Sequence, residues 1–361
     1  MSAPLGLAVV GTNWITNSFV QSCHESKLFQ LKAVYSRNLS TAKSFISETP
    51  SIQDASSVKP YDSLDTMLSE GSNINVVYIA SPNSLHYEQG VKGLNAGKHI
   101  IMEKPFASNV KELEALYKLA DSKGLFILEA YRHIQEPNFK RLQSLLDDEK
   151  TRTEKFGRIY GASLSMAVYS HFFGEVSETS VPNVASPKFS GGCLWDMGCY
   201  VVTFALRLFG TPTSQSYFPV IIQTGVDGGG LIIFNYTTES SKHKENFTVQ
   251  GRTSKIYDSS APTEIYCEKG TIRINGSLSH VADINNIEFI PRGSKDSEQL
   301  GDTSPEYTDM LNLTWEAKEL GRIIRESDRK AEGDLRTLSI DVLTAMEDMR
   351  KANGIVFDCE K

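Results

Sequence analysis

The stretch His99-Ile-Ile-Met-Glu-Lys-Pro-Phe106 is where the organisation of this chain can be recognised. Its apolar half predicts a buried strand, Lys98 to Met102, which ends at a charged pair and a proline that cannot donate to a strand ladder. An ammonium group at this point stands at the carboxyl end of a strand, where open α/β sheets bind ligands. Lys104 is therefore the first candidate functional residue. The alternative is a solvated lysine between a strand and a helix.

Composition indicates an ordinary globular chain. It has 361 residues, 40% hydrophobic and 22% charged, which is long enough for two domains. The formal net charge of −7 and the lack of any Lys/Arg block argue against a nucleic-acid partner. No apolar run approaches the length of a membrane span, and the start lacks the basic region of a secretory signal. The five cysteines have no paired or metal-like spacing, so we expect reduced thiols, no metal site and a cytoplasmic protein.

The first 130 or so residues alternate strands and helices. This alternation predicts a right-handed, mostly parallel, doubly wound sheet. The expected strands are Leu5–Val10, Phe29–Tyr35, Asn75–Ala80, Lys98–Met102 and Leu125–Leu128, and the expected helices are Trp14–Cys23, Asp65–Ser69, Tyr87–Ala96 and Lys111–Ser122.

The turn after the first strand resembles a dinucleotide-binding fingerprint in part. It reads Gly11-Thr12-Asn13-Trp14-Ile15-Thr16, so only the first of the usual glycines is present. Asn13 tolerates a left-handed backbone better than most residues, and Thr16 is small. The turn is thus a weakened match, and a plain strand-turn-helix is the alternative.

Polar residues also follow the second and third strands. Ser36 and Arg37 stand where an acid would hold a ribose 2′-hydroxyl, and a hydroxyl with a guanidinium instead favours a 2′-phosphate, hence NADP over NAD. A solvated loop arginine is the alternative. Ser81, Asn83 and His86 follow the third strand, where His86 is either a ligand contact or a cap.

From about Gly157 the pattern changes to strands with few helices between them. This predicts a second domain built on an antiparallel sheet. The expected strands are Arg158–Tyr169, Gln215–Thr224, Gly230–Thr237, Glu245–Gln250, Glu264–Glu268, Thr271–Ile274 and Asn286–Pro291; the expected helices are 191–210, Tyr307–Ser327 and Leu335–Ala352, with a polar loop over 293–305.

The helix over 191–210 carries the second group of candidates. Asp196 and Tyr200 are four apart and so share a face, and Trp195 is large enough to line a pocket. An apolar helix has no packing reason to carry a carboxylate inward. The alternative is that Asp196 only favours the first turn through the helix dipole.

These motifs together resemble the glucose-fructose oxidoreductase / inositol dehydrogenase family (Gfo/Idh/MocA). The resemblance covers essentially the whole chain, and Glu-Lys-Pro followed by Asp-x-Gly-x-Tyr is its specific part. The matching stretches are the glycine turn, Ser36-Arg37, Ser81-Pro82-Asn83, Glu103-Lys104-Pro105, Glu129-Ala130, Gly191-Gly192 and Asp196-Met-Gly198-Cys-Tyr200.

The resemblance implies a fold and an activity. It implies a Rossmann NAD(P)-binding domain in residues 1–130. Residues 131–361 would form an α+β domain with a large, mostly antiparallel open sheet, which binds substrate and joins the chain into a homodimer or homotetramer; its last helix can pack on the first domain. The expected reaction is hydride transfer between NAD(P), with NADP favoured, and a sugar, polyol or dihydrodiol.

The resemblance also assigns roles. Lys104 would contact the reacting oxygen, Pro105 would place it, a cis bond being one means, and Asp196 would bind substrate or tune the lysine. Tyr200 replaces the histidine of many members, as in the dihydrodiol dehydrogenase branch, so either Lys104 or Tyr200 can be the acid-base. The cofactor would be held by Gly11, Thr12, Asn13, Trp14, Ile15, Ser36, Arg37, Ser81, Asn83, His86, Glu103 and Lys104.

One departure leaves substrate choice open. Ile134 stands where many members carry a substrate-side arginine, and Arg132 or His133 is a candidate replacement. A non-catalytic NAD(P)-binding regulator, like the galactose corepressor of yeasts, is the alternative function. Retention of Lys104, Asp196 and Tyr200 favours the enzyme.

Overall fold

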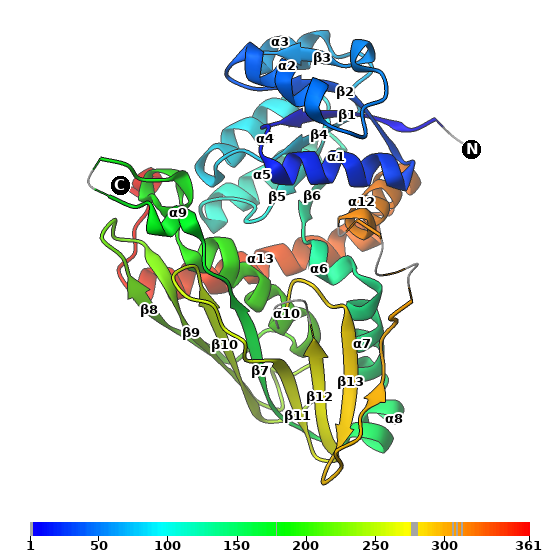
Figure 1. Cartoon of the computed structure of the whole chain (residues 1–361), viewed down its shortest axis with the longest axis vertical. Helices are drawn as coiled ribbons and strands as arrows, with labels where there is room; N and C mark the ends of the chain where they lie inside the picture. Colours follow the sequence, from blue (N-terminus) through cyan, green and yellow to red (C-terminus); the bar gives the residue numbers. More distant parts are fainter. Residues whose placement is uncertain (1–2, 178, 276–280, 305–306, 308–309, 312) are drawn as a thin grey trace. The chain divides into compact units, whose positions relative to one another are not determined.

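The computed structural model describes residues 3–177, 179–275, 281–304, 307, 310–311 and 313–361. The chain forms two compact units (Figure 1). The first unit comprises Met1–Arg132 and Met310–Ile340, and the second comprises His133–Asp309 and Asp341–Lys361.

A six-stranded sheet in the order β3-β2-β1-β4-β5-β6 forms the first unit, and all of its neighbouring strands run parallel. Its two central strands, β1 and β4, are continuous apolar runs, as is typical of parallel strands covered on both faces; all residues of β4 are buried. The doubly wound sheet is confirmed, and the short β3 is an addition. The strands are β1 (Leu5–Val10), β2 (Phe29–Tyr35), β3 (Lys59–Tyr61), β4 (Val76–Ile79), β5 (His99–Glu103) and β6 (Ile127–Ala130).

The helices of the first unit include one that the sequence reading missed, α2. They are α1 (Trp14–Ser26), α2 (Leu39–Glu48), α3 (Leu64–Glu70), α4 (His86–Asn95), α5 (Val110–Ser122), α12 (Thr314–Glu326) and the first part of α13 (Arg329–Ala352), with short turns η1 (Ala55–Ser57) and η2 (Asn83–Leu85). The predicted helix Tyr307–Ser327 begins later, at Thr314, and its positions 308–309 and 312 lie outside the described residues.

The late helix α12 completes the first unit. Thr314 donates its hydroxyl to Glu25 of α1. A Cβ at Gly321 would meet the Phe29 ring at 2.8 Å, so this helix approaches the start of β2 as closely as a glycine allows.

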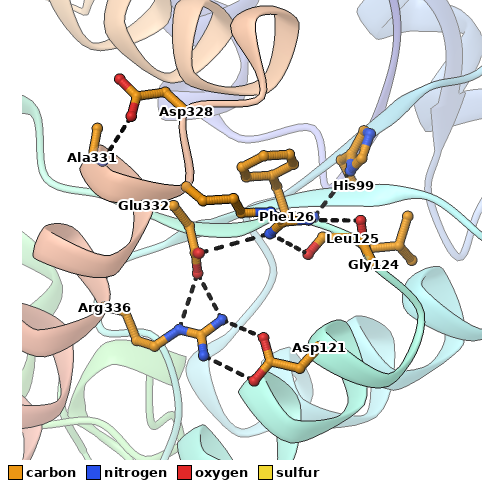
Figure 2. A network of polar contacts seen from close by, with 10 residues as sticks. His99, Asp121, Gly124, Leu125, Phe126, Asp328, Ala331, Glu332 and Arg336 are labelled. Carbon is orange, nitrogen blue, oxygen red and sulfur yellow. Dashed lines mark hydrogen bonds and ion pairs between the residues drawn. The ribbon is translucent and has the colours of Figure 1, made fainter.

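Ion pairs and hydrogen bonds join the first part of α13 to the end of α5 and to the turn that follows it (Figure 2). Arg336 pairs with Asp121 through two parallel bonds of 2.9 and 2.7 Å and also contacts Glu332. Arg329 donates to the carbonyl oxygens of Gly124 and Leu125. The residues from 310 to 340 are therefore part of the first unit's structure.

An eight-stranded sheet in the order β14-β13-β12-β11-β7-β10-β9-β8 forms the second unit. Among its described strands, β7 and β10 pair in parallel and the other neighbours are antiparallel, which confirms the mostly antiparallel sheet. The strands are β7 (Ile159–Ala167), β8 (Ser214–Ile221), β9 (Asp227–Tyr236), β10 (Phe247–Ser254), β11 (Thr263–Cys267), β12 (Gly270–Asn275), β13 (Asn286–Pro291) and β14 (Glu298–Gln299).

The helix α10 packs on this sheet. A Cβ at Gly251 of β10 would lie 2.4 Å from Val201 of α10, so glycine permits the close approach. By length and composition the segment Pro187–Phe209 could cross a membrane, but 83% of its most apolar window is buried inside the protein, as in a core helix. The helices and short turns of this part of the chain are α6 (Arg132–Gln135), α7 (Pro137–Asp147), α8 (Glu149–Thr151), η3 (Arg152–Phe156), α9 (His171–Gly174), η4 (Asn183–Ala185), η5 (Pro187–Phe189), η6 (Leu194–Gly198), α10 (Cys199–Phe209) and η7 (Asp358–Glu360).

The sheet also carries exposed side chains. Phe218 and Leu231 are direct cross-strand partners on β8 and β9, and they are 61% and 37% exposed. Arg273 forms ion pairs with Glu264 and Glu288 on the two strands beside it.

Candidate active site

The parallel sheet places the predicted residues of the first unit at one edge. Gly11, Ser36, Ser81 and Lys104 follow the carboxyl ends of β1, β2, β4 and β5. The strand order reverses direction between β1 and β4, and at such a switch point open α/β sheets bind ligands.

The glycine turn is built on Gly11. Its φ of +104° and the 2.7 Å that would separate a Cβ from the Ala80 carbonyl oxygen both require glycine. Asn13 does not use the left-handed conformation that it tolerates, since its backbone is extended (φ −79°). It caps α1 instead: its Oδ1 accepts from the Thr16 amide at 3.0 Å, and its Nδ2 donates to Ala80 O at 2.9 Å.

The start of α1 has the properties of an anion site. Its first turn carries no acidic residue, so the amides of Trp14 and Ile15 and the helix dipole favour a phosphate group. Trp14 is 72% exposed beside the turn, and Thr12 is half-buried. A hollow of about 310 Å³ between α1 and α2 lies here, lined among others by Thr12, Asn13, Trp14 and Ser44.

The residues that directly follow β2 likewise include no Asp or Glu. The Ser36 amide is held by Tyr61 O at 3.1 Å, and Arg37 is exposed. Asn38 caps α2, whose first turn has no acidic residue. A hydroxyl, a guanidinium and the N-terminus of α2 thus follow one another directly after the carboxyl end of β2.

His86 joins two of the loops at this edge. The ring is fully buried, with Nδ1 3.0 Å from Pro105 O and Nε2 2.9 Å from Ser81 O. Burial lowers its pKa to about 4, so the ring is neutral at pH 7 and donates to one of these carbonyl oxygens. His86 therefore positions the segments that begin at Ser81 and Lys104.

Acidic side chains accept hydrogen bonds from the backbone around Lys104. The buried Glu103 accepts from the Tyr78 hydroxyl at 2.6 Å and from the Lys104 amide at 3.2 Å, and burial raises its pKa. The Lys104–Pro105 peptide bond is cis. Glu129, at the end of β6, accepts from the Phe106 amide at 2.9 Å. The backbone on both sides of Lys104 is thus fixed by buried carboxyl groups.

The second unit carries the other two catalytic candidates. Asp196 lies on η6, a π-helical turn that leads into α10, and Tyr200 lies in the first turn of α10. Tyr200 is 8% exposed, with its ring 5.0 Å from that of the buried His133. Trp195, singled out for its size, is buried against Phe357 and Arg350.

Two residues that the sequence reading missed hold this turn. Lys255 forms an ion pair with Asp196. Asp227 accepts from the Leu194 amide at 2.6 Å and from the Tyr217 hydroxyl at 2.7 Å, so it fixes the start of η6. We predicted a strand over Glu245–Gln250, but β10 ends four residues later, at Ser254. Lys255 was therefore not recognised as a residue that follows a strand end.

The described residues contain neither a candidate metal site nor a disulfide bond. Within the described ranges, no group of three or more His, Cys, Asp or Glu side chains could hold a metal ion. None of the cysteines there forms a disulfide bond.

Comparison with known proteins identifies the class. A family model described as an oxidoreductase family with an NAD-binding Rossmann fold (GFO_IDH_MocA) matches residues 5–131. A scyllo-inositol 2-dehydrogenase (NADP(+)) of Bacillus subtilis is 33% identical over 98% of both chains. A trans-1,2-dihydrobenzene-1,2-diol dehydrogenase of Sus scrofa is 25% identical over 92% of this chain and 91% of its own. A 3-ketoreductase of Actinomadura kijaniata, solved with NADP, has the same fold, with a TM-score of 0.75 and 17% identity over 96% of this chain and 97% of its own.

The fold and these matches define an NAD(P)-dependent oxidoreductase with a small-molecule substrate. The chain belongs to the Gfo/Idh/MocA family, as the motif order indicated. The predicted enzyme type, a dehydrogenase of CH–OH groups, is confirmed by the 33% identity over 98% of the chain.

Proposed function

We propose that the chain transfers a hydride between NADP(H) and a sugar, polyol or dihydrodiol, and that Lys104 and Tyr200 handle the proton. The observation that carries this is Lys104 itself, at the carboxyl end of β5 with Glu103 and Glu129 fixing its backbone neighbours. Hydride transfer at carbon has to be matched by proton transfer at oxygen, and the ammonium group of Lys104 is a proton donor at this edge of the sheet.

The residues at this edge fit a dinucleotide. Gly11 lets the backbone approach, and Thr12, Asn13, Trp14 and Ile15 present the start of α1 to the pyrophosphate. Ser36 and Arg37 would hold the 2′-phosphate, and Ser81, Asn83, Glu103 and Lys104 would line the nicotinamide end, with His86 holding their loops. NADP(H) supplies or accepts the hydride when bound. The cofactor named for the Bacillus subtilis relative, NADP(+), supports the preference.

The two parts of the chain would have the roles that the family resemblance implies. Residues 1–130 would bind the cofactor, and residues 131–361 the substrate, through Asp196 and Tyr200. Tyr200 and Lys104 would share the acid-base role, since a phenol and an ammonium group can each carry the proton. The exposed Phe218 and Leu231 support a homodimer or homotetramer formed through the open sheet, and a cytoplasmic location suits the cysteines without disulfides.

The test is turnover with and without Lys104. We expect the chain to oxidise NADPH with at least one ketose, keto-cyclitol or related carbonyl compound, and Lys104→Met to lower kcat by about 10²- to 10⁴-fold with a much smaller effect on NADPH affinity. Lys111→Met, on the exposed side of α5, is the control and should keep full activity. Tight NADPH binding without turnover on any substrate would instead favour the non-catalytic regulator.

A further inference from the structure

The segment Ile355–Lys361, which follows α13, is joined to a buried arginine of that helix. Arg350 is 1% exposed, and it donates to the Ile355 carbonyl oxygen and to Glu360 Oε1, both at 2.6 Å. Glu360 Oε2 also accepts from the Phe357 amide at 3.0 Å. These three hydrogen bonds fold the segment around one guanidinium group, and we call residues 355–361 the clasp.

The clasp packs against Trp195, the residue directly before Asp196. The fully buried Phe357 ring meets the Trp195 indole edge-on, with the ring centres 5.2 Å apart. The Arg350 guanidinium lies 4.0 Å from the centre of the Phe357 ring and 5.1 Å from that of Trp195. A cation that is withdrawn from water is held more strongly by aromatic rings than an exposed cation is. The clasp therefore fixes the indole of Trp195.

A second set of contacts joins the residues after α13 to the same turn. Asn353 donates to the Tyr217 carbonyl oxygen of β8 at 2.9 Å. The Tyr217 hydroxyl donates to Asp227, which also accepts from the amide of Leu194, the first residue of η6. The two sets of contacts thus hold the first two residues of η6, directly before its carboxylate.

The geometry of η6 makes this support important for Asp196. A π-helical turn is rare, and it often occurs at functional sites. Trp195 is 1% exposed, whereas the side chain of Asp196 is 23% exposed and forms an ion pair with Lys255. Because the two neighbouring side chains share one backbone turn, a rotation that releases the indole also moves the carboxylate away from Lys255.

We infer that Arg350 and Glu360 are positioning residues: the clasp holds Trp195 and thereby sets the direction of the Asp196 carboxylate. This inference rests on the proposed function, in which Asp196 binds the substrate. A misplacement of about 1 Å in such a contact can cost on the order of 10²-fold in rate. Loss of the clasp therefore impairs the use of substrate and leaves cofactor binding intact, since the proposed cofactor residues belong to the first unit.

The first measurement is steady-state kinetics with scyllo-inositol and NADP as probes. Glu360→Ala removes the acceptor of the Arg350 guanidinium and of the Phe357 amide. We expect kcat/KM for scyllo-inositol to fall about 10- to 100-fold, with the KM for NADP nearly unchanged. Glu360→Gln keeps an oxygen acceptor and should retain most of the activity. Asp358→Ala is the control: it removes an exposed acid of the clasp, paired with Lys361 at 2.8 Å, and should behave as the wild type.

The second measurement reports on Asp196 without turnover. Lys255 is 9% exposed in its ion pair with Asp196, so acetic anhydride should acetylate it slowly, as followed by mass spectrometry. Glu360→Ala should raise this rate roughly 3- to 10-fold, because the amine is released as the pair opens. Lys242, which pairs with Asp147 elsewhere in the second unit, is the internal reference and should be acetylated at the same rate in every variant.

The two measurements separate failure of the inference from failure of the proposed function. If the wild type does not oxidise scyllo-inositol, the acetylation rates alone decide the inference. An unchanged rate at Lys255 in folded Glu360→Ala overturns it, whatever the kinetics show. If Glu360→Ala does not fold, Arg350→Lys takes its place, since lysine keeps the charge but loses the planar fork that reaches two acceptors. A rise at Lys255 without a rise at Lys242 supports the inference there, and equal rates refute it.

Discussion

The buried carboxyl group of Glu129 makes the stability of the first unit fall as the pH rises. The carboxyl is 3% exposed, and burial raises its pKa from 4.5 to about 8, with the nearby Glu103 adding to the rise. A raised pKa in the folded state means that the neutral acid stabilises the fold. That stability is fully present below pH 4.5 and is lost as the pH rises through about 8. Between pH 6 and pH 8 the loss is about 2 kcal/mol.

The substitution Glu129→Gln should remove this pH dependence, since an amide oxygen still accepts from the Phe106 amide and cannot ionise. The assay is urea unfolding of the full chain at pH 6 and pH 8, following the transition that NADPH shifts, because ligand binding identifies the cofactor-binding unit. Glu114→Gln, on the exposed side of α5, should behave as the wild type. The reasoning is refuted if Glu129→Gln loses as much stability over this range as the wild type does.

Two further substitutions test the cofactor preference and the support of η6. Arg37→Ala should raise the KM for NADPH about 10- to 100-fold and leave the KM for NADH nearly unchanged, since only NADPH carries the 2′-phosphate; equal losses would contradict the role of Arg37. Asp227→Ala should lower the free energy of unfolding by about 4 kcal/mol in urea, because the Leu194 amide and the buried Tyr217 hydroxyl lose their acceptor, whereas Tyr217→Phe should cost only about 1 kcal/mol.

The strands were predictable because burial on one or both faces leaves a clear pattern in the sequence. Asn286–Pro291 was predicted with the bounds that β13 has, and the five expected parallel strands all exist. The β3 strand was missed because three residues, one of them a proline, carry little pattern. Strand ends were harder to predict: Gly251 interrupts the apolar pattern of β10, but the strand continues to Ser254 because it pairs with β7 and β9 up to that residue.

The candidate site was predictable where it depends on strand ends. Gly11, Ser36, Ser81 and Lys104 each follow a strand, so a parallel sheet places them on one edge. The ion pair of Lys255 and Asp196 joins residues that are far apart in the chain, and no local sequence pattern predicts it. Asn13 shows a different limit, because the residue was singled out for its backbone freedom and acts through its side-chain cap.

The return of α12 to the first unit has a consequence for synthesis. The ribosome releases the sheet of this unit early, but the helix that packs on α1 and the start of β2 begins only at Thr314 of 361 residues. An apolar flank of the nascent Rossmann sheet stays uncovered until residues 314–326 have been synthesised, a period in which the sheet is open to aggregation and to chaperones. A stop codon late in the gene would therefore damage the part of the protein that was made first.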